Sequence, residues 1–224
     1  MSTEIGTPLP DWKPATLPPH EIMCGRYCQL QPLESAHAAW LWDAIEDHPD
    51  LWTYLPDGPF ESGGAFLRWV EAQLAREDMI FFAICDLSGL PIGLCAYLRI
   101  DAENGSIEIG NILFSPQLQR TRAATEAMFM LMRAVFENGF RRYEWKCNSL
   151  NKPSRNAARR LGFRFEGTFR QASIVKGCNR DTDWFSMLDS EWAGQQKAFE
   201  RWLSPANFDA SGRQIRRLEG LRAK

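Results

Sequence analysis

The segment most capable of chemistry is residues 109–127, where an apolar run ends at Phe114 and a helical pattern begins near Ala123. The first amide groups of a helix have no partners within it and carry partial positive charge. A loop that leads into such a helix can therefore bind a phosphate or pyrophosphate. Every connection from a strand to a helix offers similar donors, so this segment alone does not establish a ligand site.

Metal chemistry is not predicted. The six cysteines include no Cys-x-x-Cys pair, and the three histidines stand at no ligand spacing from them. Cys85, Cys95 and Cys147 stand in apolar stretches, where a reduced cysteine packs as a small hydrophobic side chain. We therefore expect structural thiols, no metal ion and a cytoplasmic protein.

The elements that must position residues 109–127 follow from hydrophobic periodicity and turn signals. Helices are predicted over residues 33–45, 66–74, about 123–137, 153–160 and 192–202, and strands over residues 80–86, 91–100, 106–114, 142–148, 163–169 and 183–188. The first three strands predict an antiparallel meander. The step from residue 106 through a helix to residue 148 requires a crossover and hence a parallel pair, which predicts a mixed α+β fold.

The two ends differ in composition from this central part. Residues 1–23 are rich in proline and are predicted to form an extended arm, whereas residues 24–204 form the folded domain. Residues 205–224 carry several arginines and are predicted to form a basic, solvated tail.

Composition limits the partners. The 224 residues are 45% hydrophobic and 24% charged, so the chain can form a large core without disulfide or metal support. The net charge of −2 argues against a general nucleic-acid or membrane-surface binder. No apolar run approaches the roughly 18 residues that span a bilayer. We expect no nucleic-acid or membrane partner, and a monomer or homodimer.

Two segments carry a resemblance to a known family. Residues 116–127 read Pro-x-x-Gln-x-x-x-Ala-Ala-Thr-Glu-Ala, and residues 148–163 have an Asn and a Ser before a helix that ends in Leu-Gly-Phe. The first resembles the acyl-CoA pyrophosphate loop of the GNAT N-acetyltransferase superfamily, and the second resembles a CoA motif of its RimJ/RimL-type branch. The resemblance covers residues 24–192, and the order and spacing of the two segments are more specific than either alone.

The loop departs from the family pattern at two positions. Arg120 and Arg122 stand where glycine is common, and glycine lets the backbone approach a phosphate closely. Arginine could add a charged donor to the phosphate oxygens, or its side chain could block the groove.

The resemblance implies a mixed, mostly antiparallel central sheet flanked by helices, with splayed middle strands that form an acyl-CoA cleft. It implies acetyl-CoA or CoA as co-substrate, with the pantetheine pairing to the edge of residues 111–114 and the pyrophosphate at the loop. The cofactor-binding residues implied are Asn111, Ile112, Leu113, Phe114, Gln119, Arg120, Thr121, Arg122, Ala123, Ala124, Thr125, Asn151 and Ser154.

The resemblance also implies catalytic residues. Glu108 is the candidate general base, because family members often place a carboxylate on this strand; the alternative is a solvent-facing carboxylate, since Ile107 and Ile109 take the opposite face. Ser154 is the candidate hydroxyl on the thiol side, and the alternative for it is a helix cap. A backbone donor near Leu113 would bind the oxyanion.

Four aromatic residues are candidates for the acceptor pocket: Trp52, Tyr54, Trp145 and Trp184. Their faces could hold a cationic amine, whereas the alternative is packing in the core.

The function implied is transfer of an acyl group, most simply acetyl from acetyl-CoA, to a primary amine of a small molecule or protein N-terminus by direct attack. Two alternatives stay open. One is a non-catalytic CoA-binding or regulatory protein on the same fold, motivated by the missing glycines. The other is a transferase that prefers a longer acyl donor such as succinyl-CoA.

Overall fold

The computed structural model describes residues 6–222; residues 1–5 of the predicted arm and residues 223–224 of the predicted tail lie outside the described part. The strands are β1 (Met23–Cys24), β2 (Gln29–Pro32), β3 (Met79–Cys85), β4 (Pro91–Asp101), β5 (Ser106–Phe114), β6 (Arg142–Asn148), β7 (Arg164–Val175) and β8 (Cys178–Leu188). The α-helices are α1 (His37–Asp43), α2 (Gly63–Leu74), α3 (Arg122–Glu137), α4 (Lys152–Leu161) and α5 (Asp189–Leu203).

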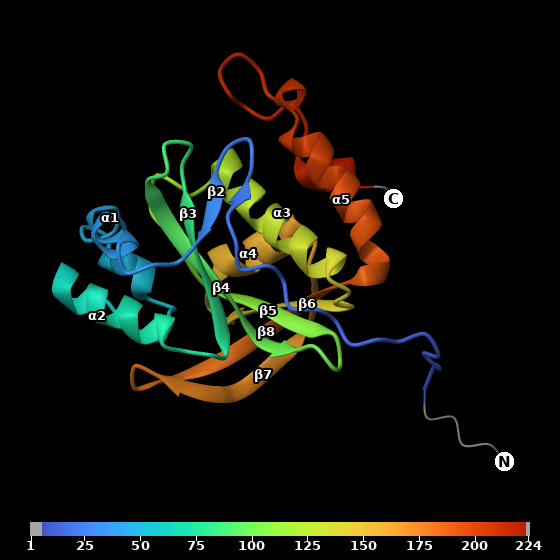
Figure 1. The fold of residues 1–224 in the computed structure, drawn as a ribbon, viewed down its shortest axis with the longest axis horizontal. Coiled ribbons are helices and arrows are strands. Elements are labelled where there is room, and N and C mark those ends of the chain that lie inside the picture. The colour runs from blue at the N-terminus through green and yellow to red at the C-terminus, as the bar shows by residue number, and fades with distance from the viewer. Residues whose placement is uncertain (1–5, 223–224) are drawn as a thin grey trace.

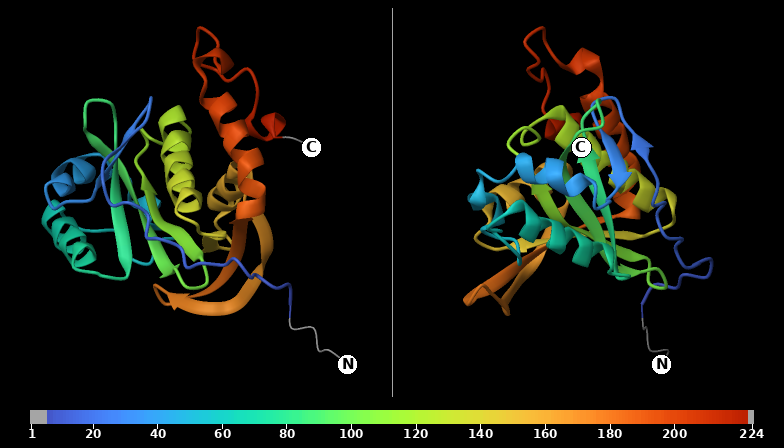
Figure 2. Two further views of the ribbon diagram at one scale, coloured as in Figure 1. Left: turned by 45° about the vertical axis from the view of Figure 1, so that its right-hand side comes forward. Right: turned by 60° about the vertical axis from the view of Figure 1, so that its left-hand side comes forward.

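The strands form one sheet in the order β1-β2-β3-β4-β5-β6-β8-β7. Helices α1 and α2 cover one face, and α3, α4 and α5 cover the other (Figures 1 and 2). All neighbouring strands are antiparallel except β5 and β6. The predicted mixed, mostly antiparallel sheet flanked by helices is confirmed.

The two middle strands splay apart, as predicted. The parallel pairing of β5 with β6 begins at Ser106 and Arg142 and ends at Ile109 and Trp145. Beyond that point the register of β5 against β4 shifts, and Asn111 adopts a left-handed backbone conformation with φ of 48°. A bulge of this kind bends a strand and disrupts its ladder. The bulge therefore accounts for the opening between β5 and β6.

Two hydrophobic clusters hold the helices on the sheet. On one face, α3 contributes Met128, Leu131, Met132 and Val135, which are buried as the periodicity predicts. On the other face, side chains of α1 and α2 pack against β3 and β4. Cys85, Cys95 and Cys147 are buried, as predicted. No helix among residues 6–222 is long and apolar enough to cross a bilayer.

The β7–β8 hairpin is longer than the sequence predicts, because both strands continue through polar residues to the turn at Lys176–Gly177. Both turn residues have positive φ, as a two-residue hairpin turn of type I′ requires. The tip of this hairpin reaches the segment between α1 and α2, where the Lys176 ammonium donates to the Trp52 carbonyl at 2.6 Å.

The segment after α5 is mostly exposed but is anchored to the fold at Asn207, Leu218 and Leu221. Leu218 and Leu221 are buried on one side of a short 3₁₀ helix that lies against α5 and α4. The Asn207 side chain bridges the Trp202 carbonyl and the backbone of Arg216. Residues 209–217 are exposed, whereas two leucines three positions apart give the basic segment an apolar side that packs on the fold.

Candidate active site

The opening beyond Ile109 and Trp145 leaves one edge of β5 unpaired over the residues predicted to bind pantetheine. Ladder partners for Leu113 and Phe114 come from β4, which occupies the other edge. The Phe114 carbonyl accepts a bond from the Gln119 side-chain amide at 3.1 Å, so Gln119 braces the end of the strand. An extended ligand can pair with this edge as an added strand.

The loop from residue 115 to 121 presents free amide groups at the start of α3. Thr121 caps the helix, because its hydroxyl accepts from the Ala124 amide at 3.1 Å. The amides of Arg120, Arg122 and Ala123 have no acceptor within residues 6–222. Together with the dipole of α3, they form the group of donors that an anionic pyrophosphate needs.

The two arginines of the loop have different surroundings. Arg120 is exposed and has φ of 62°, the left-handed conformation that glycine adopts at little cost. The Arg122 guanidinium lies over the rings of Tyr27 and Phe208, 4.9 and 4.6 Å from their centroids. Arg122 therefore joins α3 to the turn after β1 and to the C-terminal segment.

We expect Arg122→Ala to lower the free energy of unfolding by about 1–2 kcal/mol, because two cation–π contacts are lost. Arg120→Gly is the matched control and should cause little or no loss, since it relieves a left-handed residue that costs roughly 1–2 kcal/mol. Urea unfolding of both variants checks the difference. Equal destabilisation would contradict the separate placements of the two side chains.

Glu108 lies on the face of β5 that α1 and α2 cover, and only 3% of it is exposed. One carboxylate oxygen is 3.1 Å from Arg99 Nε and 3.1 Å from Lys146 Nζ. Burial raises the pKa of Glu108 above its usual value, and the two cations oppose that rise. The solvent-facing alternative is wrong, because the strands on both sides and their long side chains cover the carboxylate.

Arg99 and Lys146 are site residues that the sequence does not reveal. Both cations lie 4.9 Å from the centroid of the Trp184 ring, and Arg99 has φ of 49° at an irregularity in β4. Their approach to Glu108 depends on the pairing of three strands. No local pattern in the sequence specifies that register.

Ser154 lies on the other side of the sheet, in the first turn of α4. Asn151 is the helix cap, because its side-chain oxygen accepts from the Ser154 amide at 3.0 Å. The cap alternative for Ser154 is therefore wrong. The Ser154 hydroxyl oxygen instead accepts from the Trp145 indole N–H at 3.0 Å.

Glu108 and Ser154 thus flank the same opening from opposite faces. The last residue pair of the β5–β6 ladder is Ile109 with Trp145, and the pair before it is Glu108 with Glu144. A base on one face and a hydroxyl donor on the other can serve two reactants that meet where the strands separate.

The aromatic residues predicted for the acceptor pocket do not gather in one place. Trp145 is buried on the α3–α4 face, whereas Trp184 lies against Arg99 and Lys146, and its indole N–H has no acceptor in the described part of the chain. The Tyr54 hydroxyl donates to the Leu150 carbonyl at 3.2 Å, across the opening. Trp52 packs on Phe60 and Trp69 in the core.

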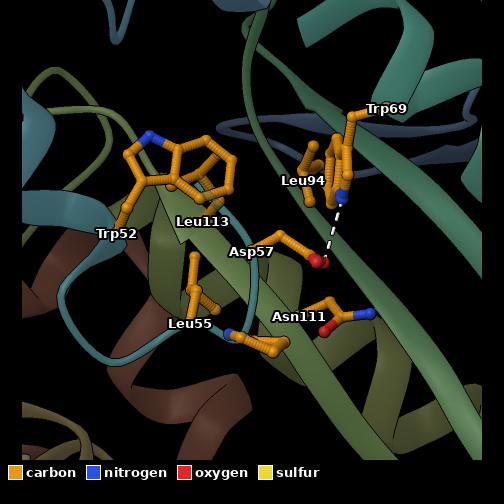
Figure 3. A pocket seen from close by; sticks show the side chains of 8 residues that line it. Trp52, Leu55, Asp57, Trp69, Leu94, Asn111 and Leu113 are labelled. Atoms are coloured by element: carbon orange, nitrogen blue, oxygen red, sulfur yellow. Dashed lines mark hydrogen bonds between the residues drawn. The ribbon is translucent and has the colours of Figure 1, made fainter. Parts of the chain in front are cut away.

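A small hollow lies between the α1–α2 connection and the bulged part of β5 (Figure 3). Trp52, Leu94 and Leu113 give it apolar walls, and Asp57 and Asn111 give it polar ones. The Asp57 carboxylate accepts from the Trp69 indole at 3.0 Å. The hollow has a volume of only about 10 Å³, room for about one water molecule, and lies on the face that carries Glu108.

Comparisons with known proteins agree with this geometry. A family model described as an acetyltransferase (GNAT) domain matches residues 28–164. A GCN5-related N-acetyltransferase from Brucella melitensis is 46% identical, and the match covers 96% of this chain and 99% of that one with a TM-score of 0.93. A probable acetyltransferase of the GNAT family from Chromobacterium violaceum ATCC 12472 is 43% identical, with 86% and 99% covered and a TM-score of 0.81. The SPbeta prophage-derived uncharacterized N-acetyltransferase YokL of Bacillus subtilis is 28% identical over 126 residues, which are 56% of this chain and 70% of that protein.

Proposed function

Since the chain belongs to the GNAT acetyltransferase family, we propose that it transfers an acetyl group from acetyl-CoA to a primary amine of a small molecule or a protein N-terminus. The observation that carries the proposal is the placement of Glu108 and Ser154 on opposite faces of one opening. CoA enters from the face of α3 and α4, and the amine enters from the face of α1 and α2.

The residues present fit CoA. The free amides of Arg120, Arg122 and Ala123 hold the pyrophosphate, and the unpaired edge of residues 111–114 holds the pantetheine. The Asn151 side-chain oxygen accepts the capping bond from the Ser154 amide, so its NH₂ group can donate to the ligand. When bound, acetyl-CoA supplies the activated thioester.

The acceptor must lose a proton for the reaction to proceed. A primary amine with a pKa near 10.4 is almost entirely protonated at pH 7, and a protein N-terminus near 7.7–8.0 is mostly protonated. Glu108 removes this proton, directly or through a water molecule. Burial favours this role, because it raises the pKa of the carboxylate toward neutrality.

The bond changes then balance across the two faces. The amine nitrogen forms a bond to the carbonyl carbon, and a β5 amide near Leu113 donates to the oxyanion. The carbon–sulfur bond breaks and its electron pair stays on sulfur. The nitrogen gives up its second proton to solvent as the amide forms. The Ser154 hydroxyl donates a hydrogen bond to the thiolate, which takes a proton from solvent, and Glu108 releases the first proton to solvent.

Two finer assignments rest on sequence features. We propose the RimJ/RimL-type branch because residues 148–163 have its order of Asn, Ser and Leu-Gly-Phe. We propose the cytoplasm because the cysteines are free and four of them are buried as thiols, which suits a reducing compartment.

CoA binding gives the first test. We expect saturating CoA to stabilise the protein by roughly 4 kcal/mol at a thousand times its dissociation constant, because only the folded chain binds it. Thermal unfolding with and without millimolar CoA measures this effect. An unchanged melting temperature would contradict the assignment of the loop amides to the pyrophosphate.

Thiol release gives the second arm of that test. Acetyl-CoA and succinyl-CoA are compared with a panel of small amines and peptides with free N-termini. We expect release with acetyl-CoA that depends on an amine. Faster thiol release with succinyl-CoA would show that succinyl-CoA, and not acetyl-CoA, is the donor. CoA binding without thiol release for every amine would contradict the proposed transfer.

A further inference from the structure

The Trp145 side chain is hydrogen-bonded to the Ser154 hydroxyl, which takes part in the proposed transfer, but Trp145 itself has no role in that transfer so far. Its ring is 5% exposed and packs against Phe163, with centroids 5.6 Å apart. It belongs to the last residue pair before β5 and β6 separate. The ring is therefore fixed at the base of the opening.

The hydrogen bond between these two side chains has only one possible direction. An indole N–H is a donor and never an acceptor, so the Ser154 oxygen accepts it. The Ser154 hydroxyl proton must consequently point toward a different acceptor. The Ser154 hydroxyl is not needed to cap α4, because Asn151 already does so.

We propose that Trp145 is a positioning residue that holds the Ser154 hydroxyl as a hydrogen-bond donor to the departing sulfur. This role rests on the proposed acetyl transfer. Without the indole N–H, the hydroxyl rotates freely and can accept as well as donate. The same oxygen then stabilises the thiolate in only a fraction of its orientations.

One competing acceptor lies nearby. The Cys147 thiol is two residues along β6 on the same face, close enough to Ser154 for a hydrogen bond. A merely structural role would have the hydroxyl proton on Cys147 rather than on the leaving sulfur. Cys147→Ala removes that acceptor and should leave turnover unchanged. A rise in turnover would show that the hydroxyl proton rests on Cys147 and would overturn the proposal.

The kinetic test uses Trp145→Phe, which keeps an aromatic ring and removes the N–H group. In Trp145→Phe we expect kcat to fall by about 10-fold, with the KM for acetyl-CoA within about 2-fold of its normal value. In Ser154→Ala we expect kcat to fall by about 10- to 100-fold. The double variant should be no slower than Ser154→Ala, because both changes remove one interaction. The proposal would be overturned if the double variant lost the product of the two single-variant factors in kcat, or if Trp145→Phe left kcat unchanged.

Trp192→Phe is the matched control. Trp192 is also buried and packs on Phe129 and Phe136, whereas the Ser154 hydroxyl accepts from Trp145. Replacement of Trp192 should leave kcat unchanged. An equal loss in Trp192→Phe would show that Trp145→Phe acts through core packing and would overturn the proposal.

An activity-free measurement separates this inference from the function on which it rests. The indole ¹H–¹⁵N signal of Trp145, assigned by its loss in Trp145→Phe, should move in Ser154→Ala. An unmoved signal shows that the hydrogen bond is absent in solution and overturns the proposal whatever the activity. A moved signal in a protein that acylates no amine would overturn the proposed transfer, and the positioning role with it.

Discussion

Glu108→Gln should lower kcat by about 10²- to 10³-fold, because a buried amide cannot take the proton of the attacking amine. Glutamine has nearly the shape of glutamate and can still accept from Arg99 and Lys146, so the fold and CoA binding should persist. Steady-state thiol release measures kcat, and the CoA-dependent shift in melting temperature confirms binding. An undiminished rate would remove Glu108 from the mechanism.

A second variant locates this effect. Glu144→Gln changes the carboxylate directly opposite on β6, which is 3.7 Å from Arg99 and 2.6 Å from Arg142, and should lower kcat by less than 10-fold. An equal loss in both variants would indicate that the charge balance of the cluster, and not a base at position 108, controls the rate.

The pH dependence follows from the direction of the shift. Only the ionised carboxylate accepts a proton, so kcat/KM falls as the pH drops through the pKa of Glu108. Burial raises that pKa, and Lys146 lowers it. Lys146→Met removes the lowering influence, so the acid limb should move to higher pH. A limb that stays in place would contradict the assignment.

The second large effect concerns stability. Glu126 is a buried carboxylate on α3 that accepts from the amides of Arg26, Tyr27 and Cys28, at 2.5–3.1 Å. Glu126→Ala leaves these three donors without their partner and should lower the free energy of unfolding by about 3 kcal/mol. For a domain of this size the melting temperature would drop by roughly 6–12 °C.

Glu137→Ala, near the other end of α3, is the control. Its side chain is 60% exposed and 4.0 Å from Arg133, so its loss should change stability by less than about 0.5 kcal/mol. Urea unfolding of both variants compares them. Similar losses would mean that the turn after β1 does not depend on the carboxylate.

Much of the framework could be predicted from local sequence. The apolar run before residue 114 and the periodic Met128, Leu131, Met132 and Val135 specify a strand and an amphipathic helix. The positions of this strand and helix also place the loop between them, whose backbone amides are the donors for a pyrophosphate. Resemblance then gives the splayed strands, which the register confirms.

The charged part of the site required long-range information. Arg99 and Lys146 meet Glu108 only because β4, β5 and β6 pair in one register, and periodicity carries no register. The cap of α4 is Asn151, whereas the sequence offered Ser154, three residues later, as the possible cap; both residue types can cap a helix, so type alone does not place the helix start. Arg122 depends on Phe208, 86 positions later in the sequence.

A crystal structure with bound CoA tests the central claim most directly, because transfer through the opening fixes where both ends of the ligand must lie. We expect the pyrophosphate on the amides of Arg120, Arg122 and Ala123. We also expect the sulfur just beyond the Ile109–Trp145 pair, within hydrogen-bond distance of the Ser154 hydroxyl. A sulfur outside this opening, or a pyrophosphate away from the start of α3, would contradict that claim.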